Sequence, residues 1–181
     1  MIFPLFRRGA RPDTISTLYG TIVAQARMPS FYREFAVADT VNGRFDLLAL
    51  HMFLVLERFS TEPSLRTVGQ GLFDRFWQDM DHNLREMAVG DLAVPKRMRA
   101  LGEAYYGRAQ AYREALATAD EGTLVEALAR NVYAGEPADP VAPHRLAAYV
   151  REAVGELAGQ DPARMAEGIL RFPTLATSSE K

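Results

Sequence analysis

The stretch from Leu72 to Met87, LFDRFWQDMDHNLREM, constrains the fold more than any other part of the chain. When it is placed on a helix at about 100° per residue, its apolar side chains fall on one narrow stripe. That stripe consists of Phe73, Phe76, Trp77, Met80, Leu84 and Met87. Charged residues of both signs fill the rest of the circumference. The pattern predicts an amphipathic helix from about Leu65 to Met87 whose apolar stripe faces a core.

Composition supports one folded domain around such a core. The chain has 181 residues, of which 48% are hydrophobic and 10% aromatic, so a sizeable core can form. The net charge of −2 and the pI of about 5.9 argue against non-specific nucleic-acid binding, and we expect no specific nucleic-acid partner. The absence of cysteine excludes disulfides, thiol catalysis and cysteine-ligated metal centres.

No segment has the length and composition of a transmembrane helix. The longest apolar run, Leu47 to Leu56, contains His51, and a span needs about 20 apolar residues. In Met1 to Arg8 the charges follow the apolar residues, which is the reverse of a signal peptide. These apolar residues could touch a membrane surface, but we expect a frayed terminus and a cytoplasmic location.

Helical periodicity and capping signals recur along the whole chain. The expected helices are Asp13–Ala26, a short one from Pro29, Arg44–Phe59, Leu65–Met87, Pro95–Leu116, Thr123–Tyr133, His144–Ala158 and Ala163–Leu170. Strand alternation is not convincing anywhere. We therefore expect an all-α protein, with a single globular domain of about seven to eight helices around the buried apolar helix at 44–59.

Turn and glycine signals suggest local details of these helices. Asn42-Gly43 predicts a turn, and Ser64 is a candidate N-cap of the amphipathic helix. Gly69 and Gly71 predict a kink or a close helix approach, because glycine weakens a helix interior. Gly107 predicts close packing in the following helix.

Shifts in composition divide the chain into five parts. We expect an N-terminal arm and helix at 1–28, a helical core at 29–134 and a proline-rich loop at 135–143. Two C-terminal helices follow at 144–172, and a disordered tail at 173–181.

The residues give no support for an enzyme. The three histidines, His51, His82 and His144, lie on three separate predicted helices, and neither a nucleophile motif nor a phosphate-binding loop is present. His82 and Glu86 alone make a poor metal site. His51 is better explained as a hydrogen-bonded core residue than as a haem ligand. We expect no catalytic residue, no metal and no cofactor.

Two features break the local rules of helix design. Lys96, Arg97 and Arg99 crowd the start of a helix, where the helix dipole disfavours cations. Either Asp91 and the acidic preceding helix neutralise them, or they meet an external acidic group. The charged ring around the stripe, which includes Asp81 and Arg85, is either a solvated face or a partner surface.

Several blocks resemble the ubiquinol–cytochrome c chaperone family. They are Leu72–Asp81, Leu84–Lys96, Asn42–Asp46 with the apolar helix to Phe59, Ala104–Arg108 with Tyr112, and Ala129–Tyr133. The blocks occur in the family's order and span roughly Phe31 to Tyr133. The N-terminal helix and the part after the proline-rich loop resemble the family loosely or not at all.

The resemblance implies a non-catalytic assembly factor for the ubiquinol–cytochrome c reductase complex. In mitochondria, proteins of this family act with a second assembly factor near the ribosomal tunnel exit and hold newly made cytochrome b. The absence of a presequence suggests a bacterial member. We therefore expect cytochrome b or its nascent chain as partner, at the cytoplasmic face of the inner membrane with peripheral membrane contact.

Polar and apolar positions of the matched blocks form the candidate partner surface. It consists of Phe73, Trp77, Asp79, Met80, Asp81, Arg85, Glu86, Asp91, Lys96 and Arg97. Part of the apolar set would then line a groove for an apolar segment. Two other readings stay open at this point: a helical module that binds haem, quinone or lipid, with His51 as the residue to watch, and a purely structural subunit.

Overall fold

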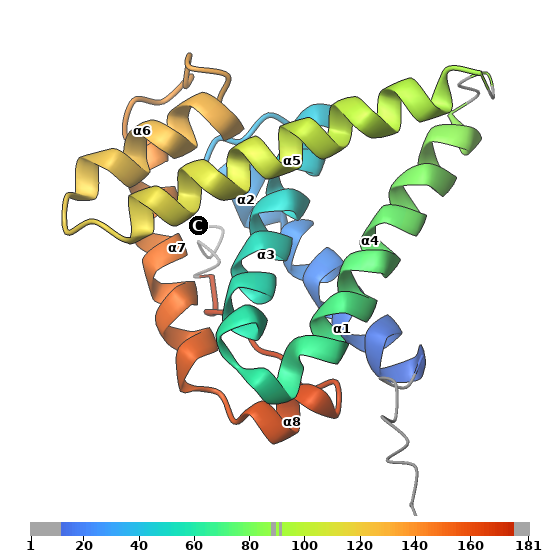
Figure 1. Ribbon diagram of the computed structural model, residues 1–181. Coiled ribbons are helices and arrows are strands. Elements are labelled where there is room, and N and C mark those ends of the chain that lie inside the picture. The colour runs from blue at the N-terminus through green and yellow to red at the C-terminus, as the bar shows by residue number, and fades with distance from the viewer. Residues whose placement is uncertain (1–11, 88–89, 91, 176–181) are drawn as a thin grey trace, which may run out of the picture.

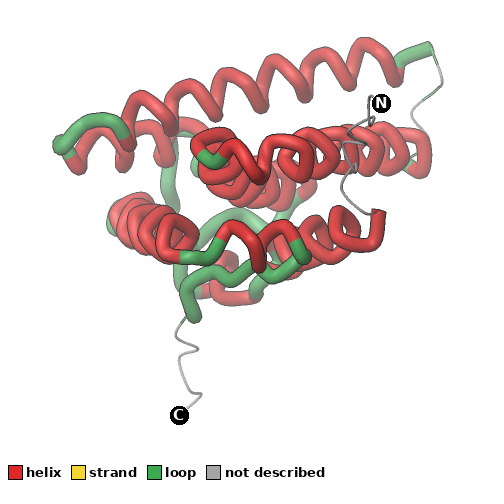
Figure 2. The backbone as a smooth tube through the Cα atoms, turned by 60° about the horizontal axis from the view of Figure 1, so that its bottom comes forward, coloured by secondary structure: helices red, strands yellow, loops and turns green. Residues whose placement is uncertain are grey.

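A computed structural model describes residues 12–87, 90 and 92–175. The described residues form eight α-helices and one 3-10 helix, without strands (Figures 1 and 2). The helices are α1 (Pro12–Ala26), α2 (Pro29–Arg33), α3 (Val41–Thr61), η1 (Pro63–Leu65), α4 (Arg66–Glu86), α5 (Val94–Leu116), α6 (Glu121–Val132), α7 (Ala142–Gly159) and α8 (Pro162–Ala166). The predicted all-α class is confirmed.

Helix α3 is the central element of the fold. Every residue from Asp46 to Val55 is buried, and α3 packs against α1, α4, α5, α6 and α7 (Figure 1). A helix that is apolar nearly all round needs such cover on every side. The prediction of a buried apolar helix at the centre is confirmed.

The predicted turn at Asn42-Gly43 is wrong, because both residues lie in the first turn of α3. Thr40 is the N-cap, and its Oγ1 accepts a hydrogen bond of 3.1 Å from the Gly43 amide. A Cβ at position 43 would lie 2.0 Å from the carbonyl oxygen of Ala38. Glycine is therefore required here by the approach of the preceding chain and not by a turn.

The start of α4 also differs from the prediction. Ser64 lies inside the 3-10 turn η1 and is no cap of α4; the Glu62 side chain caps η1 by accepting from the Ser64 amide at 3.2 Å. The close approach predicted at the two glycines is confirmed. A Cβ at Gly69 would lie 3.4 Å from the Phe59 side chain, and one at Gly71 would lie 3.0 Å from that of Ile15.

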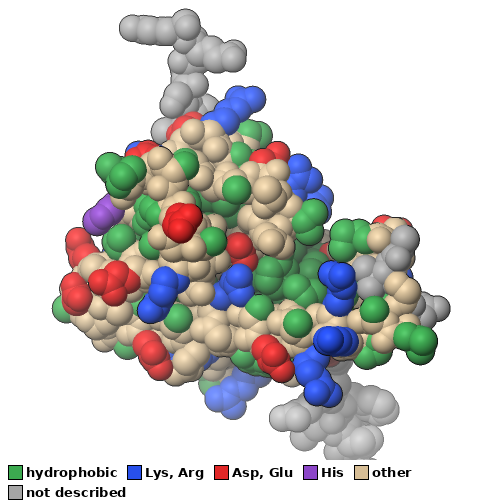
Figure 3. All heavy atoms as spheres, turned by 90° about the horizontal axis from the view of Figure 1, so that it is seen from above, with side chains coloured by type: hydrophobic (Ala, Val, Ile, Leu, Met, Phe, Trp, Pro, Cys, Tyr) green, Lys and Arg blue, Asp and Glu red, His purple; other side chains and the backbone are tan. Residues whose placement is uncertain are grey.

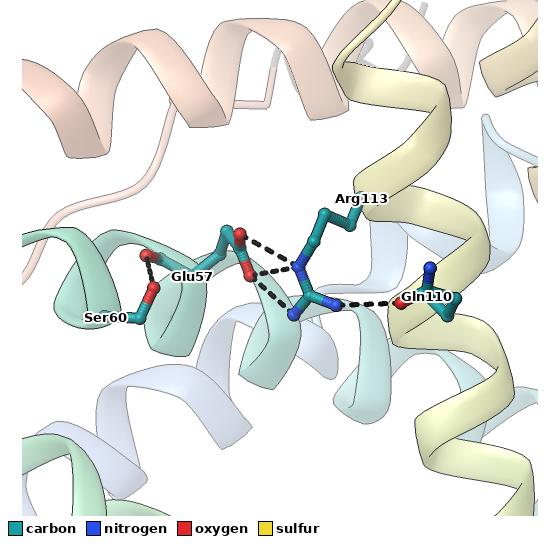
Figure 4. Close-up of polar contacts among 4 residues, drawn as sticks. All are labelled: Glu57, Ser60, Gln110 and Arg113. Atoms are coloured by element: carbon teal, nitrogen blue, oxygen red, sulfur yellow. Dashed lines mark hydrogen bonds and ion pairs between the residues drawn. The ribbon is translucent and has the colours of Figure 1, made fainter.

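Helix α5 runs without interruption through Gly107. A Cβ at this position would meet nothing within 4 Å, so the predicted close packing at Gly107 is wrong. One polar contact between α5 and α3 lies about one turn and a half further on (Figure 4). There the Arg113 guanidinium donates to both carboxylate oxygens of Glu57, at 2.9 to 3.2 Å, and to Gln110 at 3.2 Å.

The C-terminal helices complete the cover of the core. Asp161 caps α8 as predicted, since its Oδ1 accepts from the Ala163 amide at 2.9 Å, but α8 ends already at Ala166. Leu175, which the sequence assigns to a tail, is buried in the same core as α1 and α3. Residues 176–181 lie outside the described residues.

Candidate functional site: an apolar groove beside α4

The stripe of α4 is buried unevenly along its length. Phe76, Met80 and Leu84 are buried, Phe73 and Trp77 are half-buried, and the Met87 residue is 53% exposed. The C-terminal end of α4 lies near the N-terminal end of α5, and the two helices diverge from there (Figure 1). The stripe therefore faces two different environments, one near the middle of α4 and one near its C-terminal end.

The first environment is an aromatic cluster that fills the space between the diverging helices. Phe73, Phe76 and Trp77 of α4 pack against Tyr105 of α5, with ring centroids 5.6 to 6.2 Å apart. Phe76 and Trp77 also meet each other edge to face at 4.9 Å. Such tilted and T-shaped pairs are the favoured arrangements of aromatic rings. Phe73 and Trp77 thus serve the packing between α4 and α5.

The second environment is a groove of about 540 Å³ between α1, α3, α4 and α5. Its apolar lining is provided by Val23, Ala26, Val41, Phe45, Leu48, Met80, Leu84, Met87, Ala100 and Leu101. Figure 3 shows hydrophobic side chains on the floor of a hollow beside the projecting end of α4 and α5. Of the three apolar residues predicted as partner-binding, Met80 lines this groove, whereas Phe73 and Trp77 do not.

Charged side chains border the groove. Arg27 directly follows α1, Arg44 comes from α3, Glu86 from α4 and Arg97 from α5. Arg44 donates to Asp39 at 2.7 Å. With Arg44 paired, Arg27 and Arg97 against Glu86 leave a small excess of positive charge around an apolar floor, an arrangement that suits an apolar segment with an acidic flank.

The outer face of α4 carries the predicted ion pairs. Arg85 binds Asp81 with two hydrogen bonds, of 2.7 and 3.2 Å, and this guanidinium lowers the pKa of the Asp81 carboxyl. His82 Nε2 lies 3.1 Å from Glu86. All four side chains are substantially exposed, so the pairs add little to stability and remain accessible to a partner.

Asp79, which was predicted as part of the partner surface, contacts α1. Its Oδ2 accepts hydrogen bonds from the Tyr19 hydroxyl of α1, at 2.8 Å, and from Asn83, at 3.1 Å. Burial and this carboxylate raise the pKa of Tyr19. Asp79 therefore fastens α1 to α4, and its role toward a partner stays a prediction.

The remaining predicted residues lie around the connection from α4 to α5. Lys96 and Arg97 are exposed in the first turn of α5. Asp91 lies outside the described residues. Among the described carboxylates none lies within ion-pair distance of Lys96, Arg97 or Arg99, so the described part of the chain does not neutralise this basic cluster.

Sequence reasoning missed the groove residues that α1 and α3 contribute. Val23 lies in the last turn of α1 and Arg27 directly follows this helix, and Phe45 and Leu48 lie on α3. Nothing in their local spacing distinguishes them from core positions. The apolar Val41, 67% exposed in the first turn of α3, is the one local signal, since a large apolar side chain there has no core to face.

His51 is a core residue, as predicted. It is fully buried, its Nδ1 lies 2.7 Å from the Leu47 carbonyl oxygen, and its Nε2 lies 2.8 Å from the Tyr149 hydroxyl. The Tyr149 hydroxyl in turn accepts from Gln25. Both ring nitrogens are occupied, which leaves none for a haem iron. Burial lowers the pKa of His51 to about 4.

A second cavity, of about 530 Å³, is lined by a partly buried ion pair. The Arg108 guanidinium of α5 donates to Asp46 of α3 at 2.7 Å. Burial raises the pKa of Asp46 to about 6, and the attraction of Arg108 offsets only part of this rise. In the described part of the chain, no three His, Asp or Glu side chains gather closely enough to hold a metal ion, and no helix is long and apolar enough to cross a membrane.

Comparison with known proteins identifies the family. The ubiquinol–cytochrome C chaperone family matches residues 33–172, which is well over half of the chain. The chain therefore belongs to this family. The match continues through the proline-rich loop and the C-terminal helices, so it extends further than the blocks recognised in the sequence.

Individual relatives agree with this assignment. The chain is 25% identical over 138 residues to ubiquinol-cytochrome-c reductase complex assembly factor 1 of Xenopus laevis, covering 76% of this chain and 68% of the relative. It is 25% identical over 138 residues to the human protein of that name, but covers only 46% of that relative. The chain thus spans less than half of the human relative.

A solved structure matches nearly the whole chain. The crystal structure of the Cbp3 homolog from Brucella abortus is 40% identical, with a TM-score of 0.82, and the match covers 96% of this chain and 97% of that one. The similarity therefore includes α1, which lies before the residues matched by the family.

Proposed function

We propose that this protein is a non-catalytic assembly factor of the ubiquinol–cytochrome c reductase complex and that it binds newly made cytochrome b in the groove beside α4. The relatives are named as assembly factors of that complex. The single observation that carries the binding site is the open apolar groove with its basic border. A chaperone of an apolar membrane protein needs an apolar surface that stays uncovered in its own fold.

The groove suits a polypeptide segment better than a buried cofactor. Its volume of about 540 Å³ falls in the range of roughly 300–1,000 Å³ that is common for ligand sites, so size alone does not separate the two. Its four charged residues, however, are all exposed at the border of the groove. Met80 and Met87 also give the floor adaptable side chains, which are typical of surfaces that accept varied apolar segments.

Two exposed valines provide a matched test of this proposal. Val41, 67% exposed, borders the groove at the start of α3, and Val141, 55% exposed, precedes α7 away from the groove. Val41→Asp and Val141→Asp thus place the same charge in comparable local settings. An acidic residue in the first turn of a helix is compatible with the helix dipole.

The experiment is a tagged pull-down from membranes of the source organism with chemical crosslinking and mass spectrometry. We expect cytochrome b to be enriched with the wild type and with Val141→Asp, and reduced at least fivefold with Val41→Asp. Enrichment of a second assembly factor or of ribosomal proteins at the tunnel exit would extend the proposal. Equal recovery of cytochrome b with both valine variants would place the binding site elsewhere, and no recovery with any of them would refute cytochrome b as the partner.

A further inference from the structure

The groove beside α4 adjoins a second surface cleft of about 560 Å³. This cleft is lined by Arg27, Pro29, Tyr32, Arg33, Asp39 and Arg44, and we call it the arginine cleft. Arg27 and Arg44 line both the cleft and the groove. A ligand that fills the groove on the side of α1 and α3 therefore reaches the arginine cleft directly.

Three arginines face a single carboxylate in the arginine cleft. Asp39 accepts a hydrogen bond from Arg44 at 2.7 Å, and this guanidinium lowers the pKa of the Asp39 carboxyl. Arg27 and Arg33 are exposed, and no hydrogen bond or ion pair joins either of them to another residue in the described part of the chain. With three positive charges and one negative charge, the cleft carries +2 in a chain of net charge −2.

Helix stability explains the position of Arg27 but not the open hydrogen-bond donors of the cleft. Arg27 directly follows α1, where the helix dipole favours a cation. Arg33 ends α2, which has only 5 residues, so the same effect is small there. A dipole needs the charge alone and leaves the guanidinium N–H groups open. These groups bind carboxylates in a forked geometry.

We propose that the arginine cleft binds an acidic flank of the apolar segment that occupies the groove. The segment then lies with its acidic end over Arg27 and Arg33. This inference rests on the proposed function and adds the chemistry and the orientation of the bound segment. Complementary charges at the edge of an interface fix such an orientation.

Two observations favour a polypeptide with carboxylates in this orientation. The cleft shares Arg27 and Arg44 with an apolar groove, which a separate phosphate would leave empty. On the other side of the groove, Glu86 of α4 opposes Arg97 of α5. The residues that line the groove on that side therefore offer no comparable excess of positive charge.

The test uses synthetic peptides and the full chain. The probes are fluorescent amphipathic helical peptides with one leucine stripe, carrying three aspartates at the N-terminal end, three aspartates at the C-terminal end, or asparagines in their place. Fluorescence anisotropy at several salt concentrations measures their affinities. Arg33→Glu changes the cleft without touching the groove lining, and its matched control Arg97→Glu changes the groove border without touching the cleft. Val41→Asp tests the groove itself.

We expect the wild type to bind one of the acidic peptides more tightly than the asparagine peptide, by a factor that shrinks as salt rises. Exposed charge contacts each change affinity by up to about fivefold, and Arg33→Glu replaces an attraction by a repulsion. It should weaken binding of that acidic peptide by about fivefold or more and leave the asparagine peptide unchanged. Arg97→Glu should change either affinity by less than about twofold. Val41→Asp should weaken binding of all three peptides.

The outcomes separate this inference from the proposed function. If Val41→Asp weakens all peptides but the wild type does not prefer an acidic one, or Arg33→Glu and Arg97→Glu lose equally, the inference alone is overturned. Displacement by inorganic phosphate without any preference among the peptides would make the cleft a phosphate site and would also overturn it. If no peptide binds, or Val41→Asp changes none of the affinities, the groove itself fails as the binding site.

Discussion

The two halves of the apolar stripe on α4 have the same helical periodicity, but they face different surroundings. In the first half, Phe73, Phe76 and Trp77 pack against Tyr105 of α5. In the second half, Met80 and Met87 line an open groove. The difference follows from the divergence of α4 and α5, together with the chemistry of the side chains: rigid aromatic rings fill a fixed space, whereas methionines suit a variable one. We infer that the first half of the stripe stabilises the fold and that the second half binds the partner segment.

The largest expected effect is a loss of stability that distinguishes the two halves of the stripe. Phe76 is fully buried, so Phe76→Ala should lower the free energy of unfolding by about 3–5 kcal/mol. Met87→Ala, in the open half, should cost less than about 0.5 kcal/mol. Denaturant unfolding followed by circular dichroism measures both. Similar losses in the two variants would mean that the groove half is also part of the packed core.

Lowering the pH should change the stability of the packed core outside α4 through His51 and Asp46, whose contributions have opposite signs. The folded-state pKa of His51 is about 4, below its ordinary value of 6.5, so the unfolded chain binds a proton that the folded one does not. Stability from neutral His51 is present above pH 6.5 and is lost as the pH falls toward 4, by up to about 3 kcal/mol. Asp46, with its pKa raised to about 6, binds its proton more readily in the folded state, so stability rises as the pH falls from 6 toward 4.

Variants separate these two contributions. In Asp46→Asn the loss from His51 is unopposed, and the free energy of unfolding should fall steeply between pH 6.5 and 4. In His51→Gln that loss is absent, and stability should hold or rise over the same range. Denaturant titrations at a series of pH values check this. Parallel pH profiles of the two variants would contradict the assigned signs.

A smaller effect concerns the bond between α1 and α4. Tyr19→Phe removes the hydrogen bond of 2.8 Å to Asp79 and should cost about 1–2 kcal/mol, as is usual for a hydrogen bond to a charged group. Tyr32→Phe is the control, since its hydroxyl makes only one long contact, at 3.4 Å, to the Ala26 carbonyl oxygen. Thermal unfolding distinguishes them; if Tyr19→Phe were as stable as Tyr32→Phe, the bond between Tyr19 and Asp79 would not hold α1 on α4.

The smallest effect on stability is expected on the outer face of α4. Exchanging the charges in the double variant Asp81→Arg/Arg85→Asp keeps an exposed pair and should change the free energy of unfolding by less than about 0.5 kcal/mol. If this face contacts the partner, recovery of cytochrome b should nevertheless fall. Calorimetry and the pull-down measure the two quantities separately. Unchanged recovery would assign Asp81 and Arg85 to the solvated surface.

Much of the fold could be predicted because its signals are local. The apolar composition of α3, the stripe of α4 and the Asp161-Pro162 start of α8 depend on residues within a few turns of each other. The start of α3 was predicted wrongly because Gly43 is fixed by a contact with Ala38, which overrides its turn preference. Gly107 was misjudged for the opposite reason, since no neighbour approaches it.

The site was only partly predictable, because a groove forms where no other helix covers an apolar surface, and local spacing does not show where that happens. The periodicity that places Met80 and Phe76 on one stripe cannot tell which of them another helix will cover. The contributions of Arg27 and Phe45 depend on how α1 and α3 pass behind α4. Met80, Glu86 and Arg97 were predicted from the stripe and from the charged positions around it, and they are the predicted partner residues that line the groove.

Site-specific photo-crosslinking tests the central claim most directly. A photoreactive residue is placed at Met87 or Val41, in the groove, and at Val141, outside it, and the full chain is crosslinked while cytochrome b is being made. The account predicts adducts with cytochrome b from positions 87 and 41 and none from 141. Adducts from 141 alone, or equally from all three positions, would contradict the assignment of the open half of α4 as the binding site.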